Sequence, residues 1–268
     1  MRIRSLLLAL MVFSAAGPAA ADLLILVHGY QSDAGTWIRS GVASTLERTE
    51  WKPGGVLTPA GVSPTPPEIG SHTVWLAQLP SEAPLSVQAN ALLIGVQNLH
   101  RKWPDQPIVL VGHSAGGLVA RMALVLTRPA LPNTTLITIA SPHLGTVRAA
   151  QALEATRLPF PVSWMADALG GPRYQSLKRS WPLLAELAMV PGSALEWLNH
   201  QPHPQARYVS IVRGTTTGLV GDALGPGYSQ DMNQVPSLRG RAQTLLVPGS
   251  HDLGPGDGHA LLGILASP

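Results

Sequence analysis

Short, continuous runs of apolar residues recur along the chain, separated by stretches with helical spacing. The first run, Leu23–Val27, ends at His28-Gly29, which is typical of a buried parallel strand. Strands that alternate with helical patterns imply βαβ units and right-handed crossovers. The sequence therefore predicts an α/β fold with a mainly parallel sheet of about six strands flanked by helices. The other five predicted strands cover residues 73–77, 107–111, 135–139, 207–212 and 243–247.

The helical patterns lie between these runs. They predict helices over residues 36–49, 86–103, 118–126 and 258–266. Pro104 ends the second of them, because proline removes a backbone donor and clashes with the preceding turn. The stretch 53–70 is rich in Pro and Gly and has no periodicity, so we interpret it as a surface loop.

Residues 146–205 interrupt the alternation, because they carry helical patterns but no strand-like run. Three of the seven tryptophans, Trp164, Trp181 and Trp197, lie in this stretch, together with Phe160. One interpretation is a helical cap insertion that covers a site with large apolar side chains. The other is a set of ordinary helices packed on the sheet.

The N-terminus has the pattern of an export signal. Arg2 and Arg4 form a short basic region, the apolar run Leu6–Phe13 follows, and Ala19–Ala21 supplies the small residues that a signal peptidase requires. The apolar run is too short to cross a bilayer comfortably. We therefore predict a signal peptide over 1–21, a mature α/β domain over 22–268, and a periplasmic or secreted protein, with a retained N-terminal anchor as the alternative.

Composition narrows the classes of function. The chain has 268 residues, 45% of them hydrophobic and 12% charged, which indicates a folded domain with a large core. Its net charge is +3, or about +1 without the two N-terminal arginines, and no basic cluster indicates a nucleic-acid partner. The chain has no cysteine, which excludes disulfides, a cysteine nucleophile and cysteine-ligated metals.

The candidate chemistry centres on Gly112-His-Ser-Ala-Gly116. A Gly-x-Ser-x-Gly pattern alone is weak, but this one directly follows a predicted buried strand and directly precedes a predicted helix. That setting is the one a nucleophile elbow requires, because the sharp turn tolerates little side chain on either side of the serine. Ser114 is therefore the candidate nucleophile.

A nucleophilic serine needs donors for the oxyanion that forms when it attacks a carbonyl. The elbow supplies the backbone N–H of Ala115, and the loop after the first strand supplies that of Tyr30. Gly29 allows this loop to turn towards the site. His28 precedes the serine, which is the wrong chain order for the base in this fold, so we assign it a role in orienting the loop by hydrogen bonding.

The general base and its acid are expected after the serine, in the order acid, then histidine. His251 follows the last predicted strand by four residues and is favoured as the base, with His259, at the start of the last helix, as the rival. His143 lies after the fourth strand and is interpreted as a residue that packs its loop or lines the pocket.

The acid is expected after the fifth strand. Asp222 is favoured because it lies nearer the end of that strand, and Asp231 is the rival, although it is also well placed to cap a short helix. Asp252 and Asp257 are set aside, because they are too close in sequence to the histidines to approach from a separate loop. The sequence Gly254-Pro-Gly-Asp-Gly258 resembles part of a calcium repeat but occurs once, and we predict no metal and no organic cofactor.

Three segments, Leu26–Tyr30, Gly112–Gly117 and Ser141–Thr146, resemble those of α/β-hydrolase lipases and esterases. The resemblance is to the branch that includes bacterial triacylglycerol lipases and GPI-inositol-deacylase-like hydrolases, and Leu187–Asn199 is similar to a cap segment of that branch. It implies that the elbow serine, here Ser114, is the nucleophile, and that the amides at the positions of Tyr30 and Ala115 form the oxyanion hole.

These observations predict an exported serine hydrolase that cleaves carboxylic esters of lipid or other hydrophobic acyl groups through a Ser-His-Asp triad. The expected partners are a hydrophobic ester or lipid substrate, and transient contact with a membrane or lipid surface is left open. Two alternatives also stay open. An acyltransferase would use the same serine but pass the acyl group to an alcohol, and a binding protein would keep the fold without catalysis.

Overall fold

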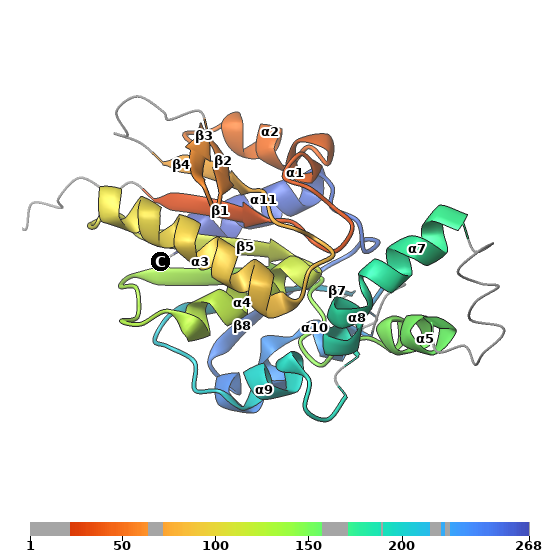
Figure 1. The fold of residues 1–268 in the computed structure, drawn as a ribbon. Helices are drawn as coiled ribbons and strands as arrows, with labels where there is room; N and C mark the ends of the chain where they lie inside the picture. The colour runs from red at the N-terminus through yellow and green to blue at the C-terminus, as the bar shows by residue number, and fades with distance from the viewer. Residues whose placement is uncertain are drawn as a thin grey trace, which may run out of the picture.

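The computed structural model describes residues 22–63, 72–156, 171–188, 190–214, 221–222 and 226–267. In these residues an eight-stranded sheet has the order β3-β2-β4-β1-β5-β6-β7-β8 (Figure 1). The short strand β3 is antiparallel to β2, and every other neighbouring pair is parallel, which confirms the predicted mainly parallel α/β sheet. The strands are β1 (Leu23–Val27), β2 (Lys52–Thr58), β3 (Gly61–Ser63), β4 (Thr73–Ala77), β5 (Ile108–His113), β6 (Thr134–Ile139), β7 (Arg207–Arg213) and β8 (Ala242–Val247).

Strands β2 and β3 correct the interpretation of residues 53–70 as a surface loop. β2 contains a proline and two glycines, and it pairs with β4 through an irregularity between Pro53 and Gly55. Gly54 lies against a tryptophan, since a Cβ at this position would be 2.5 Å from the Trp75 ring. The composition that suggested a loop therefore belongs to an irregular strand near the edge of the sheet, where proline is tolerated. Residues 64–70 of the predicted loop lie outside the described residues.

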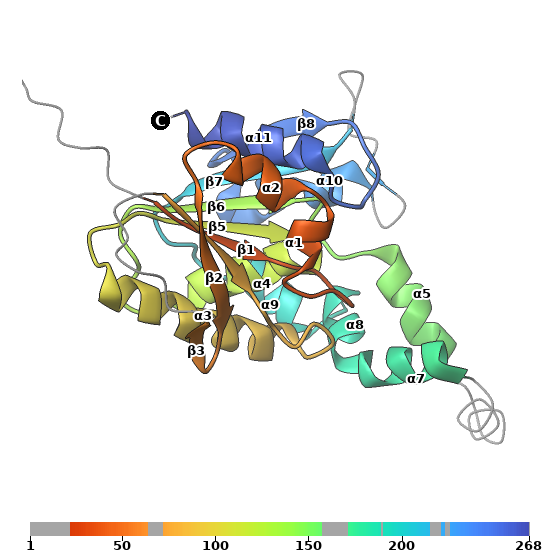
Figure 2. The same ribbon diagram turned by 90° about the horizontal axis from the view of Figure 1, so that it is seen from above.

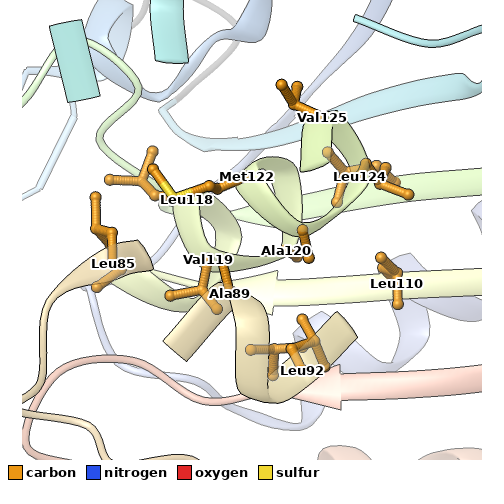
Figure 3. Close-up of a cluster of buried hydrophobic side chains, with 14 of the residues drawn as sticks. Leu85, Ala89, Leu92, Leu110, Leu118, Val119, Ala120, Met122, Leu124 and Val125 are labelled. Carbon is orange, nitrogen blue, oxygen red and sulfur yellow. The ribbon is translucent and has the colours of Figure 1, made fainter. Parts of the chain in front are cut away.

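Helices cover both faces of the sheet (Figures 1 and 2). Side chains alternate along β1, so that Leu23 and Ile25 belong to one buried cluster and Leu24 and Leu26 to the other. Figure 3 shows the first cluster, in which side chains from two helices pack over Leu110 of β5. The helices of that face are α3 (Leu85–Lys102) and α4 (Ala115–Leu126), and those of the opposite face are α1 (Thr36–Arg39), α2 (Val42–Glu47) and α11 (Pro255–Leu265).

The single helix predicted over residues 36–49 is two helices in the structure. α1 and α2 are separated by Ser40-Gly41, and Gly41 has a φ of 80°. This left-handed conformation ends a helix, and glycine adopts it without steric cost. The predictions for 86–103, 118–126 and 258–266 correspond to α3, α4 and α11.

Each of the two interpretations of residues 146–205, a cap insertion and ordinary helices packed on the sheet, fits part of the stretch. One helix, α9 (Ala194–His200), packs against α4 and buries Leu195 and Leu198 there, as an ordinary covering helix does. The other three also add apolar side chains to this cluster, but they lie beyond the carboxyl ends of the strands (Figures 1 and 2), where a cap would lie. They are α5 (Val147–Thr156), α7 (Gly171–Arg179) and α8 (Trp181–Leu187). Phe160 and Trp164 lie outside the described residues.

The segment that the sequence assigns to export, residues 1–21, also lies outside the described residues. The first strand, β1, begins at Leu23 and pairs with β4 and β5 along its whole length. Among the helices that the structure describes, none is long and apolar enough to cross a membrane.

Candidate active site

Ser114 lies at the sharp turn between β5 and α4, at the carboxyl end of the central strands. Its φ of 55° and ψ of −129° are unusual for a residue with a side chain, and the predicted nucleophile elbow requires such a strained backbone. The flanking glycines are required by close approaches. A Cβ on Gly112 would lie 2.3 Å from the backbone of Gly117, and one on Gly116 would lie 2.3 Å from the carbonyl oxygen of His28. The local sequence therefore forms the predicted elbow.

The loop after β1 passes directly against this elbow. A Cβ on Gly29 would lie 3.0 Å from the Ser114 Cβ, so glycine permits the approach. Tyr30 and Ala115, the two residues whose amides are candidates for the oxyanion hole, line the same pocket as Ser114. The structure thus brings the predicted donor residues and the predicted nucleophile to one place.

His28 has the loop-orienting hydrogen bonds that the sequence analysis assigned to it. The backbone N–H of Leu79 donates to Nε2 at 3.1 Å, so Nδ1 carries the proton and donates to the Gly29 carbonyl, also at 3.1 Å. Burial lowers the pKa of His28 below its usual value, which keeps the ring neutral in this tautomer. His28 therefore ties the loop of Tyr30 to the segment after β4.

His251 and Asp222 lie in contact in the same pocket. Nδ1 of His251 is 2.8 Å from Oδ2 of Asp222, and the aspartate side chain is 1% exposed against 15% for the histidine. A carboxylate accepts, so Nδ1 carries the proton of the neutral ring and Nε2 is left with a lone pair. Both residues line the pocket with Ser114, which brings together the three residues of the predicted triad.

The rival residues lie elsewhere. His259 is on α11, is exposed, and donates from Nδ1 to the carbonyl of Pro255 at 3.0 Å. Asp231 caps the 3₁₀ turn Met232–Gln234 by accepting from the Asn233 amide at 2.9 Å, and it also accepts from Thr244 Oγ1. Neither residue lines the pocket that contains Ser114.

His143 belongs to the loop after β6 that walls the pocket, and its side chain is fully buried. Its Nδ1 accepts from Arg121 Nη1 at 3.3 Å, and its Nε2 donates to Thr138 Oγ1 at 3.1 Å. Burial, with the nearby guanidinium, holds the pKa of His143 well below its usual value. A neutral ring with both nitrogens bonded packs the loop, which agrees with the packing interpretation of this histidine.

The pocket has a volume of about 320 Å³ and an apolar wall. The loop after β6 supplies one side of the apolar wall, and the helices α5, α7 and α8 supply most of the remainder. The helices beyond the strand ends therefore enclose the space beside Ser114. The apolar residues that line it, besides Ala115, are Ala140, Pro142, Ala149, Ala152, Leu177, Leu184 and Leu187.

Buried side chains that the sequence analysis missed hold the loop of His251. His113 donates from Nε2 to the His251 carbonyl at 2.8 Å, and burial lowers the pKa of His113 to about 4, so its ring stays neutral at higher pH. Arg213, at the end of β7, donates to the Asp252 carbonyl at 3.2 Å. Asp257 accepts from the Gly254 amide at 2.9 Å. Each contact fixes a backbone group of the loop.

Arg213 and Asp257 also form a bidentate ion pair, with distances of 2.7 and 3.0 Å. The sequence does not favour Asp257 as the acid of the triad, because it lies too close in sequence to the histidines. Its position three residues after Gly254, with Pro255 between them, is the pattern of a helix N-terminus and could have indicated its role in α11. Asp257 is thus engaged with Arg213 and not available as part of a calcium repeat.

Replacing Asp257 with Asn is expected to lower the free energy of unfolding by about 3–5 kcal/mol, because it leaves the Arg213 charge buried without a partner. The matched control is Asp33→Asn, which breaks the pair between Arg39 and Asp33. Those side chains are 63% and 51% exposed, against 2% and 4% for Arg213 and Asp257. The exposed pair is expected to contribute about 0–1 kcal/mol. Urea unfolding measures the stability loss in each variant. Equal losses would contradict a stabilising role for the buried Arg213–Asp257 pair.

Among the residues that the structure describes, no group of three or more His, Asp or Glu side chains is arranged to hold a metal ion. The prediction that the chemistry uses no metal and no organic cofactor rests on the sequence and stays a prediction.

A mainly parallel sheet with a strained serine elbow at its carboxyl edge, flanked by helices on both faces, defines the α/β-hydrolase fold. The family model of the PGAP1-like alpha/beta domain matches residues 89–156, which contain the elbow and the segment after β6. No curated protein sequence matches the chain.

Solved structures of low sequence identity share this fold over nearly the whole chain. One is the product of a Listeria innocua gene, with 15% identity, 92% of this chain and 94% of that chain covered, and a TM-score of 0.56. The mature lipase BlEst2 of Bacillus licheniformis has 13% identity, coverages of 92% and 93%, and a TM-score of 0.54. A lipase-esterase related protein from Clostridium acetobutylicum has 11% identity, coverages of 92% and 94%, and a TM-score of 0.55.

Proposed function

We propose that the chain is an exported serine hydrolase that cleaves carboxylic esters with hydrophobic acyl groups. The observation that carries the proposal is the convergence of Ser114, on its strained elbow, with the hydrogen-bonded His251–Asp222 pair in one pocket. The names of the structural neighbours support it, because two of them are a lipase and a lipase-esterase related protein.

In the proposed mechanism His251 Nε2 removes the hydroxyl proton as Ser114 Oγ attacks the ester carbonyl carbon. Asp222 keeps the proton of the imidazole on Nδ1 and stabilises the imidazolium that forms. The amides of Tyr30 and Ala115 donate to the tetrahedral oxyanion, and each such donor contributes on the order of 3 kcal/mol. Collapse expels the alcohol, which takes the proton from His251, and water then hydrolyses the acyl-enzyme by the same steps.

The apolar wall of the pocket supports a hydrophobic acyl group. Leucines of α7 and α8 and alanines of α5 line the space beside Ser114. Burial of an acyl chain there would contribute about 0.8 kcal/mol for each methylene group. The three helices would then act as the cap that the sequence pattern of 146–205 suggests.

Transient contact with a lipid surface is also part of the proposal. Val147 and Tyr228, 63% and 54% accessible, line one surface hollow, and exposed apolar side chains that lie together mark interaction sites. The export signal over residues 1–21 remains part of the proposal on the grounds of its sequence pattern.

Labelling with a fluorophosphonate ester tests the proposal directly, because the reagent modifies only an activated serine. The mature protein is expected to be labelled at the peptide that contains Ser114, as mapped by mass spectrometry, and the Ser114→Ala variant is expected to take up no label. Adding detergent separates a covered site from an inactive one. A folded wild-type protein that stays unlabelled in both conditions would contradict the proposed function.

A further inference from the structure

Gln230 makes contacts that no step of the proposed mechanism uses. It is the last residue of α10 (Gly227–Gln230), it is 2% exposed, and it lines the pocket of Ser114. Its Oε1 accepts from the backbone N–H of Arg213 at 2.9 Å, and its Nε2 donates to Asp222 Oδ2 at 2.9 Å. The amide therefore joins the end of β7 to the carboxylate that holds His251.

The neighbours of the amide determine which way it points. A backbone N–H only donates, so it must face the oxygen of the Gln230 amide, and an ionised carboxylate only accepts, so it must face the nitrogen. Turning the amide over would place donor against donor and acceptor against acceptor. Gln230 can thus satisfy Arg213 and Asp222 together in one orientation only.

The backbone of α10 is fixed as well. Ser229 Oγ donates to the Gly145 carbonyl at 2.8 Å, and the His143 amide donates to the Ser229 carbonyl at 2.6 Å. On the other side of Gln230, the Met232 amide donates to Ser210 Oγ at 3.0 Å. Gln230 is therefore anchored both to the loop after β6 and to β7, and it presents its donor from a rigid support.

Two donors meet at one oxygen of the acid. Asp222 Oδ2 accepts from His251 Nδ1 at 2.8 Å and from Gln230 Nε2 at 2.9 Å. A hydrogen bond from the fixed amide restricts the rotation of the carboxylate, and catalysis depends on such orientation because a misplacement of about 1 Å can cost a factor of about 100 in rate.

From this geometry we propose that Gln230 is a positioning residue, which holds the Asp222 carboxylate in the rotamer that bonds His251. The inference rests on the proposed function for its catalytic consequence, but the arrangement itself can be tested separately. A residue that only filled space would leave the rate of the chemical step unchanged when replaced by an apolar residue of similar size.

Gln230→Met removes both hydrogen bonds and keeps the length of the side chain. It is expected to lower kcat on a soluble short-chain ester by about 10–100-fold, with KM unchanged. The matched control is Gln88→Met. Gln88 is also 2% exposed and donates to a backbone carbonyl, that of Ala83 at 2.7 Å, but it lies on α3. This control is expected to keep kcat.

A second variant covers the case in which Met destabilises the fold by leaving the Arg213 amide unpaired. Gln230→Glu keeps the acceptor for that amide. A shared proton can still bridge two buried carboxyl groups, so kcat is measured with increasing pH until both are ionised and the donor to Asp222 is lost. Like charges repel, so Asp222 is expected to turn away and kcat to fall at least as far as in the Met variant. Wild-type kcat in both folded variants would overturn the proposal.

The proton NMR resonance of His251 Nδ1–H separates failure of this inference from failure of the proposed function. We expect the resonance in the wild type and its loss or displacement in Gln230→Met, whatever the activity. If the wild type cleaves no ester but the resonance changes, the positioning role stands and the function fails. If the wild type is active and both the resonance and kcat survive in the variants, the positioning role is wrong.

Discussion

Replacing His251 with alanine is expected to lower kcat for ester hydrolysis by about a millionfold, the loss seen when the base of a serine triad is removed. Without Nε2 the Ser114 hydroxyl has no acceptor for its proton, and the alcohol that leaves has no donor. The remaining rate would come from the oxyanion donors and substrate binding. The measurement is kcat on a soluble p-nitrophenyl ester, with the fold checked by circular dichroism.

His259→Ala is the matched control, because the sequence alone leaves both late histidines as candidates. His259 is exposed and bonded to the Pro255 carbonyl of its own helix, outside the pocket of Ser114. Its replacement is expected to leave kcat unchanged. A large loss in this variant, with an active His251→Ala enzyme, would exchange the two assignments.

The sequence predicts best those features that depend on neighbouring residues. The elbow is local, since one strand, one turn and one helix form it within residues 108–126. β1 and the first four residues of β5 are continuous apolar runs, because central parallel strands are buried on both faces. β2 lacks this pattern, because Gly54 is required by the close approach of the Trp75 ring, and Pro53 and Gly55 flank an irregularity in the strand pairing.

Contacts between residues that are distant along the chain could not be predicted from the sequence. His113 reaches the carbonyl of a residue 138 positions away, and Gln230 bridges to Arg213 and Asp222, 17 and 8 positions away. Nothing in the local pattern of either residue indicates these partners, because the fold alone decides which loop ends meet at the sheet edge. Chain order and the strand ends sufficed to favour Asp222 and His251, whereas the side chains that hold them required the structure.

The second large expected loss of kcat concerns the acid of the triad, for which the sequence offers Asp222 and Asp231. Asp222→Asn is expected to lower kcat by about 10⁴-fold with little change in KM. An amide at this position can donate to Nδ1, which would move the imidazole proton to Nε2 and remove the acceptor for the Ser114 hydroxyl. The measurement is again kcat and KM on the soluble ester.

Asp231→Asn is the control, because this carboxylate accepts from the Asn233 amide and Thr244 Oγ1, away from the pocket. The substitution weakens a cap, which costs about 1 kcal/mol of stability, and leaves the tautomer of His251 unchanged. Comparing the two variants therefore separates effects on folding from effects on catalysis. Asp222→Asn is expected to lower kcat and to keep nearly full stability, whereas Asp231→Asn is expected to lower stability and to keep the full kcat. The reverse result would place the acid of the triad at Asp231.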